Sequence, residues 1–175
     1  MPLVLCILVL LAIFFPGVIR ALYFVLMLAV LCVAGLAIQG ASASGLPPVV
    51  QAAYDEAAKT CAPDKTDIQK GFITTKDVNG DGIPDYILDY GKVTCGHSGS
   101  LKCGSDGCLT QIYASMPDGR FAKVFDDNVQ AMKFSTSGGR PVIRIGLHGS
   151  ACGKAGYQPC GETLFWNGAR FSPAH

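Results

Sequence analysis

Asp77-Val78-Asn79-Gly80-Asp81-Gly82-Ile83-Pro84-Asp85 is the stretch from which the organisation of this chain is most directly inferred. Oxygen-bearing side chains recur at alternate positions, and the glycines among them give the backbone the freedom that a sharp bend requires. Calcium takes about six to eight oxygen ligands in flexible loops of this kind. The stretch therefore predicts a calcium loop, with side-chain oxygens from Asp77, Asn79, Asp81 and Asp85 and the backbone carbonyl of Ile83.

Strand-like residues flank the loop on both sides. Phe72-Ile73 precedes it and Tyr86-Ile87-Leu88 follows it, and Leu88 stands where an EF-hand would need a bidentate glutamate. The pattern D-x-N-x-D-G-x-x-D before an apolar strand resembles instead the calcium loop of FG-GAP/VCBS-type repeats. That resemblance implies the same five calcium ligands. FG-GAP/VCBS-type repeats form β-propellers when several copies follow one another, so the single copy in this chain does not imply a propeller. Without metal, the same residues would form a turn held by Asx hydrogen bonds.

The chain as a whole resembles small bacterial exported proteins of unknown function that carry one such loop and paired cysteines. This resemblance implies no activity.

Outward from the loop, the pattern predicts a mainly β (α+β) domain. Residues 49–61 have apolar side chains at helical spacing, so we expect an N-terminal helix. Downstream, the pattern changes to a period of two: Tyr86, Leu88 and Tyr90 alternate with Ile87 and Asp89, and Ile143, Ile145 and Leu147 alternate with Val142, Arg144 and Gly146. Asp118-Gly119 and Asn167-Gly168 are favoured in tight hairpin turns, because such turns need positive φ. We therefore expect an antiparallel meander of about six or seven strands after the helix.

The first 43 residues are almost entirely apolar, and Arg20 is their only charged side chain. Ala41-Ser42-Ala43 is typical of a signal-peptidase site, so we expect residues 1–43 to act as a signal peptide or membrane-targeting segment. Residues 1–19 would then be an overcalled start or an extension. Alternatively, 2–19 and 21–38 insert as a hairpin, or 21–38 remains as an anchor that holds the domain outside. Residues 44–48 read as a linker and 49–175 as one domain.

Cysteine content agrees with delivery to the periplasm or the exterior. Six cysteines lie beyond the apolar segment: Cys61, Cys95, Cys103, Cys108, Cys152 and Cys160. An even number in a small exported domain predicts three disulfides. Cys152–Cys160 is the favoured bridge because its loop is short. The other four leave two alternatives open, Cys95–Cys103 with Cys61–Cys108, or Cys61–Cys95 with Cys103–Cys108.

Charge is nearly balanced, with 14 Lys/Arg, one of which is Arg20, against 13 Asp/Glu. The sequence shows no basic stripe or acidic tail, which argues against nucleic acid or a charged polymer as a partner. The leading hypothesis is therefore a non-enzymatic calcium-binding module that binds an envelope ligand or an unknown protein. Membrane contact would be confined to the N-terminal segment.

The alternative is a small secreted hydrolase that uses carboxylates or the His148-Gly149-Ser150 loop, although the G-x-S-x-G nucleophile motif is absent from the sequence.

Overall fold

A computed structural model describes residues 45–96 and 98–174. The hypotheses about residues 1–43, whether cleaved signal or anchor, lie outside this part of the chain. Within it, helix α3 (Pro48–Ala57) comes first, and no helix there is long and apolar enough to span a membrane. The described residues fall in one compact unit.

The first sheet is antiparallel and contains the predicted calcium loop between two of its strands. Its order is β2-β3-β6-β7, and the short β5 pairs with the start of β6. The strands are β2 (Ile73–Lys76), β3 (Asp85–Asp89), β5 (Cys103–Gly104), β6 (Gly107–Ser115) and β7 (Phe121–Val129). A separate two-stranded ribbon pairs β1 (Thr66–Ile68) with β4 (Val93–Cys95), and the 3-10 turn η1 (Tyr90–Lys92) leads into it.

The second sheet is an antiparallel meander in the order β8-β9-β10-β11. After β7 the chain passes through Gln130 directly into the first strand of this sheet. The strands are β8 (Ala131–Ser137), β9 (Arg140–Leu147), β10 (Cys160–Trp166) and β11 (Phe171–Pro173), and the 3-10 turn η2 (Gly149–Cys152) follows β9.

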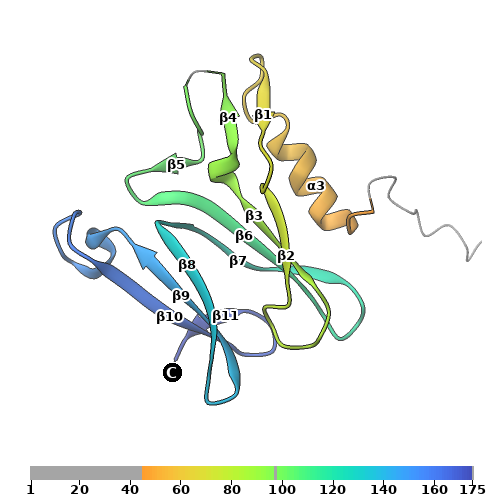
Figure 1. Cartoon of the computed structure of the whole chain (residues 1–175), viewed down its shortest axis with the longest axis vertical. Helices are drawn as coiled ribbons and strands as arrows, with labels where there is room; N and C mark the ends of the chain where they lie inside the picture. Colours follow the sequence, from red (N-terminus) through yellow and green to blue (C-terminus); the bar gives the residue numbers. More distant parts are fainter. Residues whose placement is uncertain (1–44, 97, 175) are drawn as a thin grey trace, which may run out of the picture. The chain divides into compact units, whose positions relative to one another are not determined.

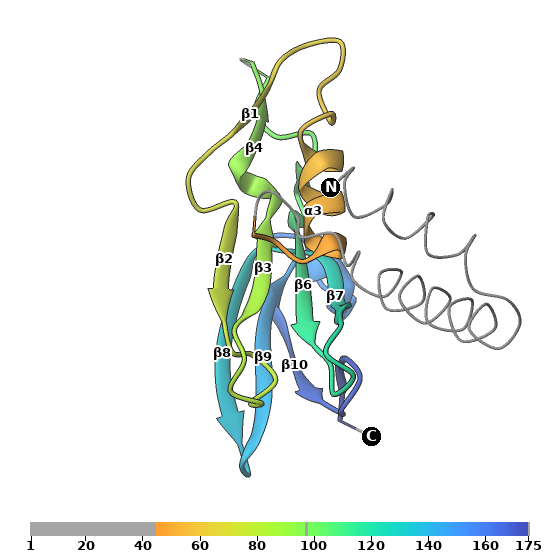
Figure 2. The same cartoon turned by 90° about the vertical axis from the view of Figure 1, so that its right-hand side faces the viewer.

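The five-stranded sheet is the middle layer of the domain (Figure 1). One of its faces supplies Leu88 and Tyr113, which pack with Val50 of α3. Its other face supplies Ile112, which packs with Ile143 and other apolar residues of the four-stranded sheet. The alternation of side chains along each strand explains this division, since successive residues point to opposite faces. Figure 2 shows the same strands from the side.

The mainly β, antiparallel character is confirmed, but three details of the predicted architecture are wrong. The helix ends at Ala57 instead of residue 61 and opens the described domain, not the chain. The described residues form eleven strands where six or seven were expected. β1, β4 and β5 have only two or three residues, which is too short for an alternating pattern to reveal them. The expected single meander is instead divided between two sheets and a ribbon. The chain leaves the first sheet for the second at Gln130, and the segment between β3 and β6 forms β4 of the ribbon and β5 before it returns.

Three disulfides join the six cysteines of the domain. Cys152–Cys160 is the bridge that loop length favoured, and the other two follow one of the open alternatives, Cys61–Cys95 with Cys103–Cys108. Cys61–Cys95 links the segment after α3 to β4, and Cys103 lies opposite Cys108 in the β5–β6 register. Cys61–Cys95 and Cys103–Cys108 therefore hold the short strands β4 and β5, whose own pairing is limited, and Cys152–Cys160 ties η2 to β10.

A glycine pair in the β5–β6 hairpin provides a matched test of this packing. Gly107 has φ +99°, and a Cβ there would lie 2.1 Å from the backbone oxygen of Val129. Its partner Gly104 has open space at the same position. We expect Gly107→Ala to lower the free energy of unfolding by at least about 2 kcal/mol, because both strain and overpacking oppose it. Gly104→Ala should change it by less than about 0.5 kcal/mol in urea titrations. Equal losses of unfolding free energy in Gly107→Ala and Gly104→Ala would contradict the close packing of Gly107 against Val129.

Candidate functional site

The predicted calcium loop is the connection between β2 and β3, whose last and first residues, Lys76 and Asp85, are register partners. Asp77 starts the loop, and its two carboxylate oxygens accept hydrogen bonds from the backbone N–H groups of Gly80 at 2.7 Å and Gly82 at 3.0 Å. Both glycines have positive φ, +82° and +84°. The loop can close around the Asp77 carboxylate because glycine adopts this conformation without strain.

Asn79 and Asp81 connect the loop to the end of β6. The Asn79 side-chain amide donates to the backbone oxygen of Ser115 at 2.9 Å and to Asp81 at 3.1 Å. Asp81 accepts from the Ser115 hydroxyl at 2.5 Å and from the Ile83 N–H at 2.8 Å. The hydrogen bond from Ser115, with smaller contributions from Ile83 and Asn79, holds the pKa of Asp81 below its ordinary value of 3.8.

Asp85 is completely buried where β3 begins. One carboxylate oxygen accepts from the Val78 N–H at 2.8 Å. The other accepts from the Ser115 N–H at 2.8 Å and lies 3.0 Å from the Ser115 hydroxyl. These neutral donors compensate the loss of hydration that burial of a carboxylate imposes.

The five predicted calcium ligands are thus neighbours in one loop, and their binding of calcium stays a prediction. Asp77, Asp81 and Asp85 each accept hydrogen bonds from backbone amides, and Ile83, the residue predicted to bind through its carbonyl, is 49 % exposed. In residues 45–96 and 98–174 no group of three or more His, Cys, Asp or Glu side chains is gathered as in a metal site, which does not test a loop whose predicted ligands include an amide and a carbonyl oxygen. Chemically the donors suit calcium, which prefers carboxylate, amide and carbonyl oxygens.

Ser115 is the functional candidate that sequence reasoning missed. It is only 3 % exposed and contacts Asn79, Asp81 and Asp85 through its backbone and side chain. It lies thirty residues after Asp85 at the end of a strand, and a lone serine in that position carries no sequence signal. Only the pairing of β3 with β6 brings it to the loop.

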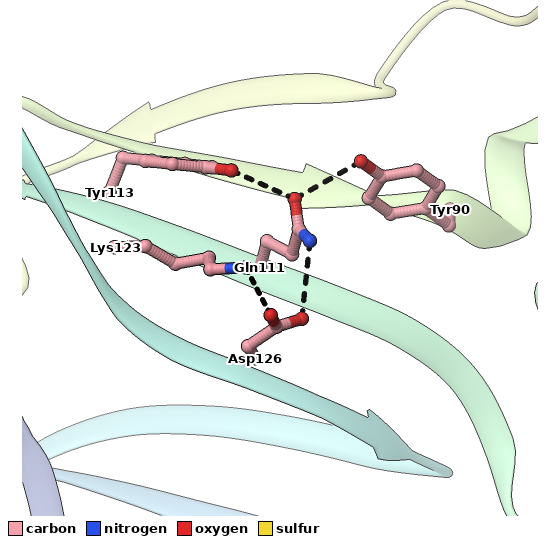
Figure 3. Close-up of polar contacts among 5 residues, drawn as sticks. All are labelled: Tyr90, Gln111, Tyr113, Lys123 and Asp126. Carbon is pink, nitrogen blue, oxygen red and sulfur yellow. Dashed lines mark hydrogen bonds and ion pairs between the residues drawn. The ribbon is translucent and has the colours of Figure 1, made fainter. Parts of the chain in front are cut away.

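A second polar cluster lies on the face of the same sheet that packs against α3 (Figure 3). The Gln111 side-chain oxygen accepts hydrogen bonds from the hydroxyls of Tyr90 and Tyr113, each at 3.0 Å. The Gln111 amide donates to Asp126 at 3.1 Å, and Lys123 forms an ion pair with the same carboxylate. Both carboxylate oxygens of Asp126 are therefore engaged within this cluster.

His148 and Ser150 do come together, with the Ser150 hydroxyl 2.8 Å from His148 Nδ1. The carboxylate of Asp106 is 3.7 Å from the same ring nitrogen. A catalytic relay needs the serine on one nitrogen and the carboxylate on the other, so that the imidazole can move a proton between them. The other nitrogen, Nε2, lies against Gly156, where an added Cβ would be 2.3 Å away. The Cys152–Cys160 disulfide closes the loop that follows Ser150 and contains Gly156.

Comparison with known proteins gives no independent assignment: no family model, curated protein or solved structure matches the chain.

The polar cluster around Gln111 yields a stability prediction. Gln111→Leu leaves the hydroxyls of Tyr90 and Tyr113 without their buried acceptor, and each unsatisfied group costs roughly 1–3 kcal/mol. We therefore expect chemical denaturation to show a loss of about 2–4 kcal/mol. Lys123→Met removes only the exposed ion pair and should cost less than about 1 kcal/mol. A loss for Gln111→Leu no larger than that for Lys123→Met would show that the cluster is not a stabilising unit.

The same cluster predicts alkaline sensitivity. Burial, with a smaller contribution from Tyr113, raises the pKa of Tyr90 well above its ordinary value of 10.0, and burial also raises the pKa of Tyr113. The stability from these protonated hydroxyls is complete below pH 10.0 and is lost as the pH rises toward their folded-state pKa values. We expect the free energy of unfolding to fall above that pH, and less steeply in Tyr90→Phe. Tyr157→Phe, at a residue 89 % exposed, should keep the wild-type slope. If the free energy of unfolding fell equally steeply with pH in the wild type, Tyr90→Phe and Tyr157→Phe, the buried hydroxyl of Tyr90 would not be the cause of the alkaline sensitivity.

Proposed function

We propose that the chain is an exported, non-enzymatic binding module whose 77–85 loop is organised by calcium. The observation that carries the proposal is the set of partners of its three aspartates. Every hydrogen bond that the structure gives to Asp77, Asp81 and Asp85 comes from a backbone amide, the Asn79 amide or the Ser115 hydroxyl. These donors are all neutral, so three negative charges share one short loop, and a divalent cation would offset their repulsion.

The Ser115 hydroxyl adds a second line of support. Its oxygen lies 2.5 Å from Asp81 and 3.0 Å from Asp85. A serine hydroxyl carries one proton, so it can donate fully to only one of these carboxylates at a time. The remaining close approach between oxygens is unfavourable, and a nearby cation would relieve it.

The residues that would hold the ion are Asp77, Asn79, Asp81 and Asp85 through side-chain oxygens and Ile83 through its carbonyl. Calcium there would be structural: it would fix the β2–β3 connection and, through Ser115, its attachment to β6. The module would then present rigid loops to an envelope ligand or protein.

Export is supported by two features of the chain. The three disulfides are consistent with an oxidising extracellular or periplasmic location. The apolar first 43 residues supply the expected targeting segment.

Calcium-dependent melting tests the proposal. A ligand that binds only the native state stabilises it by about 2.7 kcal/mol at a hundredfold excess over Kd. For a domain of this size each kcal/mol raises Tm by roughly 2–8 °C. We therefore expect Tm to rise by several degrees between EGTA and about 10 mM calcium, a range set by the millimolar affinities of extracellular modules.

Asp81→Asn should abolish this rise, because it removes a charge but keeps the shape of the side chain. Asp67→Asn, at an exposed position of β1 outside the loop, is the matched control and should retain the rise. A wild-type Tm that is the same in EGTA and in calcium would leave the loop as a hydrogen-bonded turn. A rise that persists in Asp81→Asn would place the ion elsewhere.

A further inference from the structure

The outward side of the four-stranded sheet gathers exposed positive charge. Lys133 of β8 and Arg140 and Arg144 of β9 alternate with residues of the inter-sheet core, so they share the face turned away from it. Thr163, Phe165 and Ser172 lie in register on the same face. We call the side of the sheet that carries these six residues the basic face.

The charges on the basic face are not balanced by acidic neighbours. Lys133 and Arg144 are direct register partners, and like charges in that position destabilise a sheet. None of the three cations forms a salt bridge within residues 45–96 and 98–174. The one acid of the second sheet, Glu162, is the register partner of Ile145 and belongs to the opposite face. An anionic partner would relieve this repulsion.

The overall composition conceals this concentration of charge. Residues 45–128 contain eight Lys/Arg and twelve Asp/Glu, whereas residues 129–174 contain five Lys/Arg and one Asp/Glu. The balanced total argued against a charged polymer as partner. The register shows that the basic residues instead collect on one face of one sheet.

One end of the basic face is hollowed around Arg140. The hollow has a volume of about 530 Å³, and its lining includes Ser137, Arg140, Phe165, Asn167 and Ser172. The Arg140 guanidinium carbon lies 5.1 Å from the centre of the Phe165 ring. This cation–π contact orients the guanidinium while its N–H groups keep their capacity to bind an acceptor. Neutral hydroxyl and amide groups surround it.

We propose that the basic face binds an acidic polysaccharide, with one carboxylate or sulfate group held by Arg140 in this hollow. A guanidinium binds such groups through two parallel hydrogen bonds, and the serine and asparagine side chains match sugar hydroxyls. Arg144 lies four residues along β9, about 13 Å away, with Lys133 beside it. Cations at two positions along a strand fit a chain with repeated anionic groups better than a single small anion. Nucleic acid is less well matched, because Arg140 already covers Phe165, the aromatic ring on which a base would stack.

The 77–85 loop connects two strands of the other sheet and approaches β9 at Pro141, which by the alternation of β9 lies on the face opposite to Arg140. The two proposals therefore have separate tests. Binding is therefore measured with calcium chelated by EGTA. The full-length protein is titrated, in one detergent throughout, into fluorescently labelled polygalacturonate and heparin. Neutral dextran and a single-stranded DNA oligonucleotide serve as comparison probes, and fluorescence anisotropy is the readout.

We expect the wild-type protein to bind at least one of the acidic polysaccharides more tightly than DNA, and not to bind dextran. Arg140→Gln should weaken binding at least about tenfold, since a charge-assisted pair is lost. Arg140→Lys should restore part of the affinity, because it keeps the charge but cannot form the bidentate contact. The double variant Lys133→Gln, Arg144→Gln should make the affinity for the polysaccharide depend less on salt concentration. Lys59→Gln, which removes one positive charge just after α3, is the matched control and should bind like the wild type.

Equal binding by Arg140→Gln and Lys59→Gln would overturn the assignment of the hollow. Tighter binding to DNA than to either polysaccharide would overturn the choice of partner. Absence of binding to either polysaccharide by a correctly disulfide-bonded protein would overturn the proposal as a whole.

Discussion

The buried carboxylate of Asp85 is the interaction on which the arrangement of the first sheet depends. It accepts hydrogen bonds from Val78 within its own loop and from Ser115 at the end of β6, thirty residues later. A fully buried carboxylate would be strongly destabilising without such partners. The β2–β3 connection and the end of β6 must therefore meet at this point, which sets the position of β3 between its two neighbours. Val78, whose N–H binds Asp85, also packs in the core between the sheets. The loop thus belongs to the core as much as to the surface.

The two faces of the five-stranded sheet use polar groups differently. Toward α3, the Gln111 cluster satisfies two buried tyrosine hydroxyls and ends at an exposed ion pair between Lys123 and Asp126. At the β2–β3 loop, carboxylates meet only neutral donors. In the Gln111 cluster the charge of Asp126 is neutralised by Lys123, which favours a structural role for that cluster. The second arrangement concentrates negative charge, and this is the physical basis of the proposal that a cation binds at the β2–β3 loop.

Charge is also separated along the chain. The acidic loop lies in the first half of the domain and the basic face in the second, because the chain crosses at Gln130 from one sheet to the other. Each sheet can consequently carry its own kind of charged partner: a cation that would stabilise the fold and a polymer that would occupy the basic face. A near-zero net charge keeps the whole domain from repelling itself while both local charges persist.

The sequence by itself determined the features that depend on neighbours along the chain. These include the antiparallel β character, the turns at Asp118-Gly119 and Asn167-Gly168, and the oxygen-rich loop from Asp77 to Asp85, since glycine positions and alternation are local signals. Tertiary structure alone decided what depends on register. Ser115 reaches the loop, Gln111 reaches Tyr90, and Lys133 lies beside Arg144 only because particular strands pair, and strand pairing joins residues that no local pattern connects. The choice between the two open sets of disulfides has the same origin, because Cys95 meets Cys61 through the β1–β4 ribbon, whose strands are too short to be recognised in the sequence.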